Sequence, residues 1–135
     1  MRDSFPFERL LRAAGGQAPP QRLLFVFARV DLPDDPSPEQ RERFSAGRGG
    51  MLTPLMCLDK APGDLPNFEA LAMEAQSSGP PWQLVFAAAL PGAKGEPPSE
   101  AQIGPAFETM VHAVWRGEVT PFAAYTSAGD AVTFG

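Results

Sequence analysis

Three apolar runs along the chain predict the strands of a sheet. Residues 23–30 (LLFVFARV) are continuously apolar up to Arg29, which is typical of a strand covered on both faces. Residues 82–90 (WQLVFAAAL) have the same character. Residues 51–58 (MLTPLMCL) form the third run. Because Pro54 has no N–H to donate to a ladder, this strand is expected at an edge of the sheet or with a bulge.

The segments around these runs predict four helices: three repeat apolar residues at helical spacing, and the second is predicted from the capping residues at its start, with Phe44 as its only apolar anchor. We expect them over residues 6–14, from 38 to about 46, from 65 to 77, and in a segment that contains Ile103 and Val114. Asp64 is expected to cap the third helix. Gly15 is expected to supply the left-handed end of the first helix, and Gly117 is expected to end the fourth.

Two S-x-x-Q patterns stand near the predicted helix starts. Ser37 and Gln40 enclose a proline at the first helical position, so they predict a capping box for the second helix. Ser99 and Gln102 precede the fourth helix, but Gly104-Pro105 follows them. That pair therefore indicates either a cap or part of the preceding loop.

The order of elements is α-β-α-β-α-β-α-β-β, which predicts an α/β fold. We expect one domain over residues 1–135, with a mixed sheet of about four to five strands covered by helices. Gly129-Asp130 lies between two β-rich runs and predicts a C-terminal hairpin within residues 121–134. The connections are long enough for parallel crossovers but do not require them.

Charge and cysteine content exclude several functions. The chain carries 16 acidic and 11 basic residues, and its basic side chains form no stripe, so we expect no nucleic-acid binding. Cys57 is the only cysteine, which excludes an internal disulfide and a cysteine-based zinc cluster. The first residues do not resemble a signal peptide, and no apolar run is long enough to cross a membrane. The cytoplasm is the expected location, without a cofactor or membrane contact.

The acidic and basic residues after the three strands are the candidate ligand-binding site. If those strands are parallel, their carboxyl ends bring three loops to one edge of the sheet. The candidate ligand-binding residues in these loops are Asp31, Asp35, Asp59, Lys60 and Lys94. Aspartate and lysine together can carry out acid–base chemistry, but the same residues also fit ordinary solvated turns. Their spacing matches no calcium loop, and we predict no metal site.

Three further features have a structural and a functional interpretation. Cys57 is either a core residue of its apolar strand or a nucleophile beside charged neighbours. His112 forms either an exposed pair with Glu108 or the centre of a catalytic set. The glycine-rich residues 47–50 follow a helix and open a strand, so a turn fits them better than a phosphate loop. In each case the structural interpretation is favoured.

Four segments of the chain carry a resemblance: QRLLFVFARVDLPDD, SPEQRERF, GRGGMLTPLMCLDKAP and WQLVFAAALPG. They resemble a family of small proteobacterial proteins of unassigned role. Some members are labelled ribonucleotide reductase subunit alpha. That reaction needs a radical cysteine and a redox-active cysteine pair, which one cysteine cannot supply. The resemblance therefore implies no catalytic residue. The helix, apolar strand and glycine-rich turn into an L-x-P strand also resemble SseB-like domains, which bears on fold alone.

The few catalytic residue types and the many aromatic ones favour a non-enzymatic domain that binds a protein partner or itself. An uncovered sheet edge invites pairing, so we expect a homodimer with Phe122, Tyr125 and Phe134 near the contact. The alternative is an enzyme or small-molecule binding protein that uses the Asp/Lys loops. A closed pocket lined by those loops would favour the alternative, and a flat apolar patch would favour the binding domain.

Overall fold

The computed structural model describes residues 5–16, 20–31, 35, 37–45 and 51–133. The predicted order of elements is confirmed, with one additional 3-10 helix. The elements are α1 (Phe5–Gly15), β1 (Gln21–Asp31), α2 (Pro38–Ser45), β2 (Met51–Lys60), η1 (Pro62–Asp64), α3 (Phe68–Ser78), β3 (Leu84–Pro91), α4 (Glu100–Arg116), β4 (Ala123–Thr126) and β5 (Ala131–Val132).

All five strands form one open sheet in the order β2-β1-β3-β4-β5, and each neighbouring pair is antiparallel. The α/β class is confirmed, but the prediction of a mixed sheet is wrong. A continuous apolar run shows that both faces of a strand are covered, and it carries no information about strand direction. Here helices cover both faces of an antiparallel sheet, an arrangement more often associated with parallel strands.

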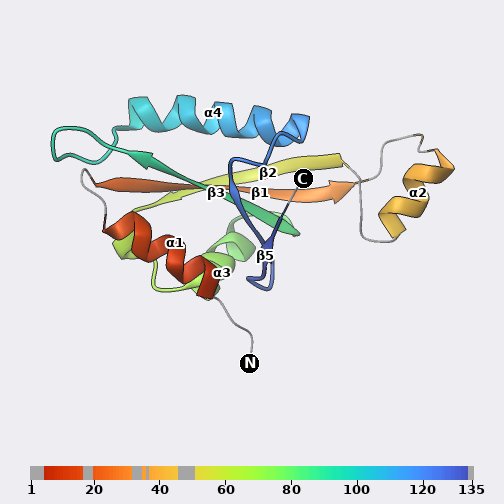
Figure 1. The fold of residues 1–135 in the computed structure, drawn as a ribbon, viewed down its shortest axis with the longest axis horizontal. Helices are drawn as coiled ribbons and strands as arrows, with labels where there is room; N and C mark the ends of the chain where they lie inside the picture. Colours follow the sequence, from red (N-terminus) through yellow and green to blue (C-terminus); the bar gives the residue numbers. More distant parts are fainter. Residues whose placement is uncertain (1–4, 17–19, 32–34, 36, 46–50, 134–135) are drawn as a thin grey trace.

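Helices cover the two faces of the sheet unequally (Figure 1). α1 and α3 lie on one face, and α4 alone lies on the other. Successive residues of β1 alternate between the faces: Phe25 packs toward α1 and α3, and Val26 packs toward α4. This double coverage explains why the whole run from Leu23 to Ala28 is buried. α2 lies apart from both layers, beyond one end of the sheet.

Aromatic rings fill the core on the α1/α3 face. The ring of Phe7 lies 5.2 Å from that of Phe68 and 5.3 Å from that of Tyr125, in both cases edge to face. Phe27 and Trp82 form another edge-to-face pair, with ring centroids 4.8 Å apart. Such geometry places the positive ring edge against the negative face and adds to the stabilisation from burial.

The β2 strand lies at the edge of the sheet and contains a bulge, so both halves of the prediction from Pro54 are confirmed. Phe27 pairs with Met56, whereas the next residue of β1 pairs with Pro54, so Leu55 is the extra residue. A bulge of this kind bends an edge strand and interrupts its ladder where proline cannot donate.

Capping residues fix three helix starts. The Ser37–Gln40 capping box is formed: Gln40 Oε1 accepts from the Ser37 N–H at 2.7 Å, and Ser37 Oγ accepts from the Gln40 N–H at 3.2 Å. Ser99 caps α4 and is not part of a loop, since Gln102 Oε1 accepts from its N–H at 2.8 Å. The cap of α3 is Asn67, whose side chain accepts from the Ala70 N–H at 2.9 Å.

The predicted start of α3 at residue 65 with Asp64 as its cap is therefore wrong, because residues 62–64 form the separate η1 turn. Gly117 ends α4 as predicted and has the left-handed conformation, with φ 73°. Gly15 is the last residue of α1 but has no positive φ, so the prediction of a left-handed end there is wrong. The C-terminal hairpin is confirmed as β4 and β5, with Gly129 at φ 92° in the turn between them.

Candidate functional site

The antiparallel sheet separates the predicted ligand-binding residues. Asp31 pairs with Met51 at one end of the sheet, and Lys60 pairs with Leu23 close to the opposite end. Pro91, before the loop that carries Lys94, also lies at that opposite end. The expectation that residues 31–35, 58–64 and 90–96 meet at one edge is thus wrong, because it required parallel strands.

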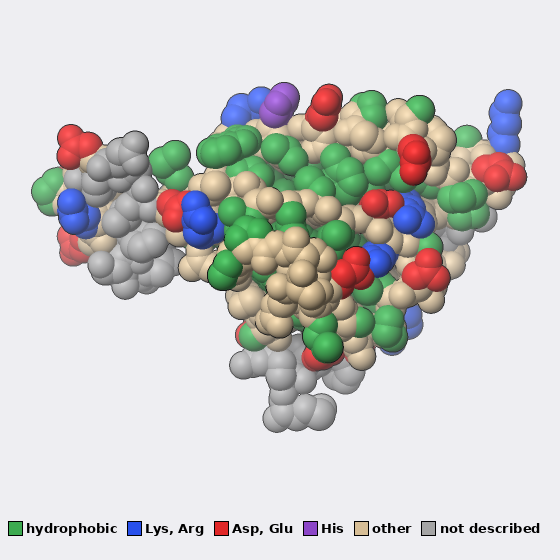
Figure 2. All heavy atoms as spheres, turned by 180° about the vertical axis from the view of Figure 1, so that it is seen from behind, with side chains coloured by type: hydrophobic (Ala, Val, Ile, Leu, Met, Phe, Trp, Pro, Cys, Tyr) green, Lys and Arg blue, Asp and Glu red, His purple; other side chains and the backbone are tan. Residues whose placement is uncertain are grey.

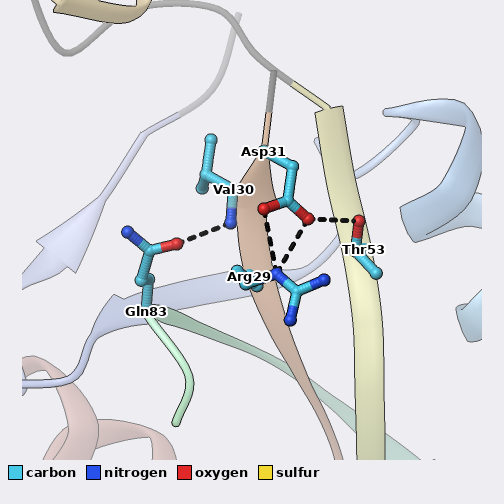
Figure 3. A network of polar contacts seen from close by, with 5 residues as sticks. All are labelled: Arg29, Val30, Asp31, Thr53 and Gln83. Carbon is cyan, nitrogen blue, oxygen red and sulfur yellow. Dashed lines mark hydrogen bonds and ion pairs between the residues drawn. The ribbon is translucent and has the colours of Figure 1, made fainter. Parts of the chain in front are cut away.

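Asp31 takes part in a polar network that joins the end of β1 to its neighbours (Figure 3). Arg29 Nε lies 2.9 and 2.8 Å from the two carboxylate oxygens of Asp31, and Thr53 Oγ1 donates to one of them at 3.0 Å. The hydrogen bond from Arg29 holds the pKa of Asp31 below its usual range. Beside it, Gln83 Oε1 accepts from the Val30 N–H at 2.7 Å. These contacts bind β2 and the start of β3 to β1.

Asp59 and Lys60 are neighbours in the chain but lie on opposite faces of the sheet. Asp59 Oδ2 accepts from Arg22 Nε at 2.7 Å, and Lys60 Nζ lies 2.6 Å from Oε1 of Glu74 on α3. Each charge therefore has its own partner, and the two side chains do not form an acid–base pair.

Lys94 lies at the tip of a tight turn. It has φ 55° and Gly95 has φ 75°, and the flanking Ala93 and Glu96 exchange backbone hydrogen bonds at 3.0 and 2.9 Å. Two successive positive φ angles are the signature of a type I′ hairpin turn, so Lys94 has a structural reason for its position. Asp35 is exposed just before α2. Within the described ranges, no three metal-ligating side chains come together.

Among the hollows lined by described residues, two are open to solvent and do not contain the predicted ligand-binding residues. One, of about 370 Å³, lies between α1 and the η1 turn and is lined by Leu11, Arg12 and Pro62 among others. The other, of about 490 Å³, lies beside Trp82 and Ser127. Among the residues that the structure describes, no charged side chain is buried.

An apolar surface that sequence reasoning missed lies where α4 overhangs the outer strand. It consists of Phe107, Val111 and Trp115 on α4 with Leu52, Pro54 and Cys57 on the α4 side of β2, and we call it the edge face. Trp115 is 53% exposed. Figure 2, which views the molecule from behind, shows hydrophobic side chains gathered along this side below α4.

The spacing of the α4 residues gave a signal for this surface. Phe107, Val111 and Trp115 recur at every fourth position, beside the buried stripe of Met110 and Val114. A single stripe of residues facing the core accounts for only part of the width of this apolar face of α4. The remaining flank of α4 lies on the side of β2, the strand that the helix contacts.

Cys57 is exposed, so the prediction that it lies in the core is wrong. The bulge places Leu55 and Met56 both toward the α1/α3 face, and Cys57 then points to the α4 side of an edge strand. Partial burial still raises the pKa of the thiol, which disfavours the reactive thiolate at neutral pH. His112 lies exposed on α4.

The residues expected at a dimer contact have three different positions. Tyr125 is 3% exposed and belongs to the aromatic core, so its ring is not available to a partner. Phe122 is half-buried against the α4-side core. Phe134 lies outside the described residues, as does the glycine-rich segment 47–50.

Comparisons of the chain with protein-family models, with curated proteins and with solved structures gave no match. Among the helices of the described residues, none is long and apolar enough to cross a membrane.

Proposed function

We propose that this protein is a non-enzymatic domain of the cytoplasm that binds another polypeptide through the edge face. The observation that carries the proposal is the outer strand β2, ten residues long, beside the exposed indole of Trp115. In the described part of the chain β2 pairs with β1 alone. Except at Pro54, which has no N–H, the outer backbone groups of such a strand are available to pair with a strand of another protein.

The composition of the edge face supports a protein partner. Trp and Phe are enriched where proteins meet, and the edge face carries Trp115, which is 53% exposed, with Phe107 on the same flank of α4. The residues of the alternative, small-molecule function are instead divided between the two ends and two faces of the sheet. Asp59 and Lys60 are each held by a separate ion pair.

The test compares three tagged baits in an extract of the native cells: the unaltered chain, Trp115→Glu and Met73→Glu. Met73 is 69% exposed but lies on α3, across the sheet from α4, and so provides a matched control. We expect at least one protein, the untagged chain included, to be retained by the unaltered and Met73→Glu baits and lost with Trp115→Glu. Identical retention by all three baits, or retention by none, would contradict the proposal.

A further inference from the structure

We infer that the polypeptide on the edge face is a second copy of this chain, whose β2 strand pairs antiparallel with the first about a two-fold axis. The two sheets then form one continuous sheet with both α4 helices on the same face. This inference rests on the proposed function and names the partner. Its support comes from the lengths of the sheet edges, from the charges on β2 and from the position of α4.

The two edges of the sheet differ in length. β2 has ten residues, whereas β5 at the other edge has two. A two-residue edge offers few backbone groups to another strand. Self-pairing therefore uses one long edge from each copy and, within the described residues, leaves no second long edge, so the assembly closes as a dimer instead of extending as a filament.

The charge pattern of β2 permits the strand to pair with itself. Residues 51–58 carry no charge, and the two charged residues, Asp59 and Lys60, stand together at one end. Antiparallel pairing places that end opposite the uncharged start of the second copy's strand, so like charges do not face each other across the contact. Arg22 and Glu74 already neutralise the two side chains within each copy. Repulsion is thus low at this contact although the whole chain has a net charge of -5.

The position of α4 adds a second layer to the contact. Neighbouring strands lie about 4.8 Å apart, so the two-fold axis stands roughly 2.4 Å outside each β2 strand. Because α4 lies over β2 and β1, a helix midway between these strands stands about 5 Å from the axis, and the two α4 helices are roughly 10 Å apart across it. Helices pack at about 8–10 Å when their side chains interdigitate. Large side chains on the facing flanks fill the space between the helices.

These large side chains are the ones that the edge face provides. The flank of α4 carries Phe107, Val111 and Trp115 along its length. With the two helices antiparallel about an axis near Val111, Trp115 of each copy approaches Phe107 of the other. Cys57, on the strand below, becomes covered by the paired helices. The pairing therefore removes from solvent the exposed apolar groups that the monomer leaves on this side.

The experiment is sedimentation velocity on the full chain from about 1 to 100 μM, a range that brackets the affinity of ordinary reversible dimers. We expect a species of twice the 14.4 kDa chain mass to increase with concentration. Trp115→Glu and Cys57→Lys, which place like charges near the axis, should raise the dissociation constant at least about tenfold. Met73→Glu should leave it unchanged. Circular dichroism and thermal melting establish that each variant is folded.

A second measurement needs no substitution. Alkylation of Cys57 at fixed pH should slow as the protein concentration rises through the dimerisation range, because the dimer covers the thiol. A single 14.4 kDa species at every concentration would overturn the inference. So would a dimer that Trp115→Glu does not weaken and in which Cys57 reacts as fast as in the monomer. A monomer that still captures another protein in a Trp115-dependent manner would overturn only the inference that the partner is a second copy of this chain. The proposed function would remain standing.

Discussion

The two faces of the sheet use the same strands but are covered differently. On the α1/α3 face two helices and aromatic rings close the core, and Trp82 is 7% exposed there. On the α4 face a single helix covers a core that is largely aliphatic, and Trp115 is 53% exposed at its flank. The difference teaches that one helix is too narrow for a five-stranded sheet. The surface it leaves open lies at the outer strand, where we propose that another polypeptide chain pairs.

The largest effect is expected in the closed core. Phe25→Ala should lower the free energy of unfolding by about 3–5 kcal/mol, because a fully buried ring leaves a cavity among packed aromatic groups. Leu24→Ala, one residue earlier and facing α4, should cost about 2–5 kcal/mol. Urea unfolding monitored by circular dichroism measures both. A cost for Phe25→Ala below about 1 kcal/mol would show that this face is not the main core.

The two tryptophans offer the most direct comparison of the faces. Trp82→Ala should cost about 3–5 kcal/mol, since its ring is buried against Phe27 and Phe68. Trp115→Ala should change the stability of the monomer by only about 0.5 kcal/mol, as for other exposed positions. Both are measured by urea unfolding at a protein concentration too low for association. Equal losses at the two sites would mean that Trp115 serves the fold and not a contact.

A smaller loss is expected at the turn that presses the C-terminal hairpin onto the aromatic core. At Gly129 φ is 92°, and a Cβ there would lie 3.1 Å from Cδ2 of Phe68. Gly129→Ala should therefore cost about 1–3 kcal/mol through backbone strain and crowding. Gly63→Ala is the matched control, because a Cβ at Gly63 meets nothing within 4 Å. Thermal melting should show a lower midpoint for the first variant and no decrease for the second.

Local features of the fold were predictable because their physical causes are local. The apolar runs gave the strands, and Pro54 by itself indicated an edge strand with a bulge. Ser37 and Gln40 fixed the start of α2 through side-chain hydrogen bonds over three residues. The start of α3 was misplaced since Asp64 and Asn67 are both good caps and residues 62–64 form the separate η1 turn.

Long-range features of the site were not predictable in the same way. Whether Asp31 meets Asp59 depends on strand direction, which a doubly covered strand does not encode in its own residues. The exposure of Cys57 depends on how far α4 extends over β2, a property of the assembled layers. The burial of Tyr125 likewise follows from its contact with Phe7, more than a hundred residues earlier in the chain.

The smallest effect concerns the ion pair at the exposed end of β1. Asp31→Asn should cost about 0.2–1 kcal/mol at neutral pH, because Asp31 and Arg29 are 35% and 48% exposed and solvent screens their attraction.

Since the pKa of Asp31 is lowered in the folded state, its stabilisation is complete above the unfolded pKa of about 3.9 and is lost as the pH falls through the folded value. The difference between the unaltered chain and Asp31→Asn should thus begin to shrink near pH 4 and disappear once the pH is below the folded value. Glu118→Gln is the control, because Glu118 has the same contact with Arg116 at 2.9 Å but is 64% exposed, and it should show no measurable loss. Urea unfolding between pH 3 and 7 measures this difference, and a loss for Asp31→Asn that stays constant over the whole range would assign the role of Asp31 to its hydrogen bond with Thr53 instead of its charge.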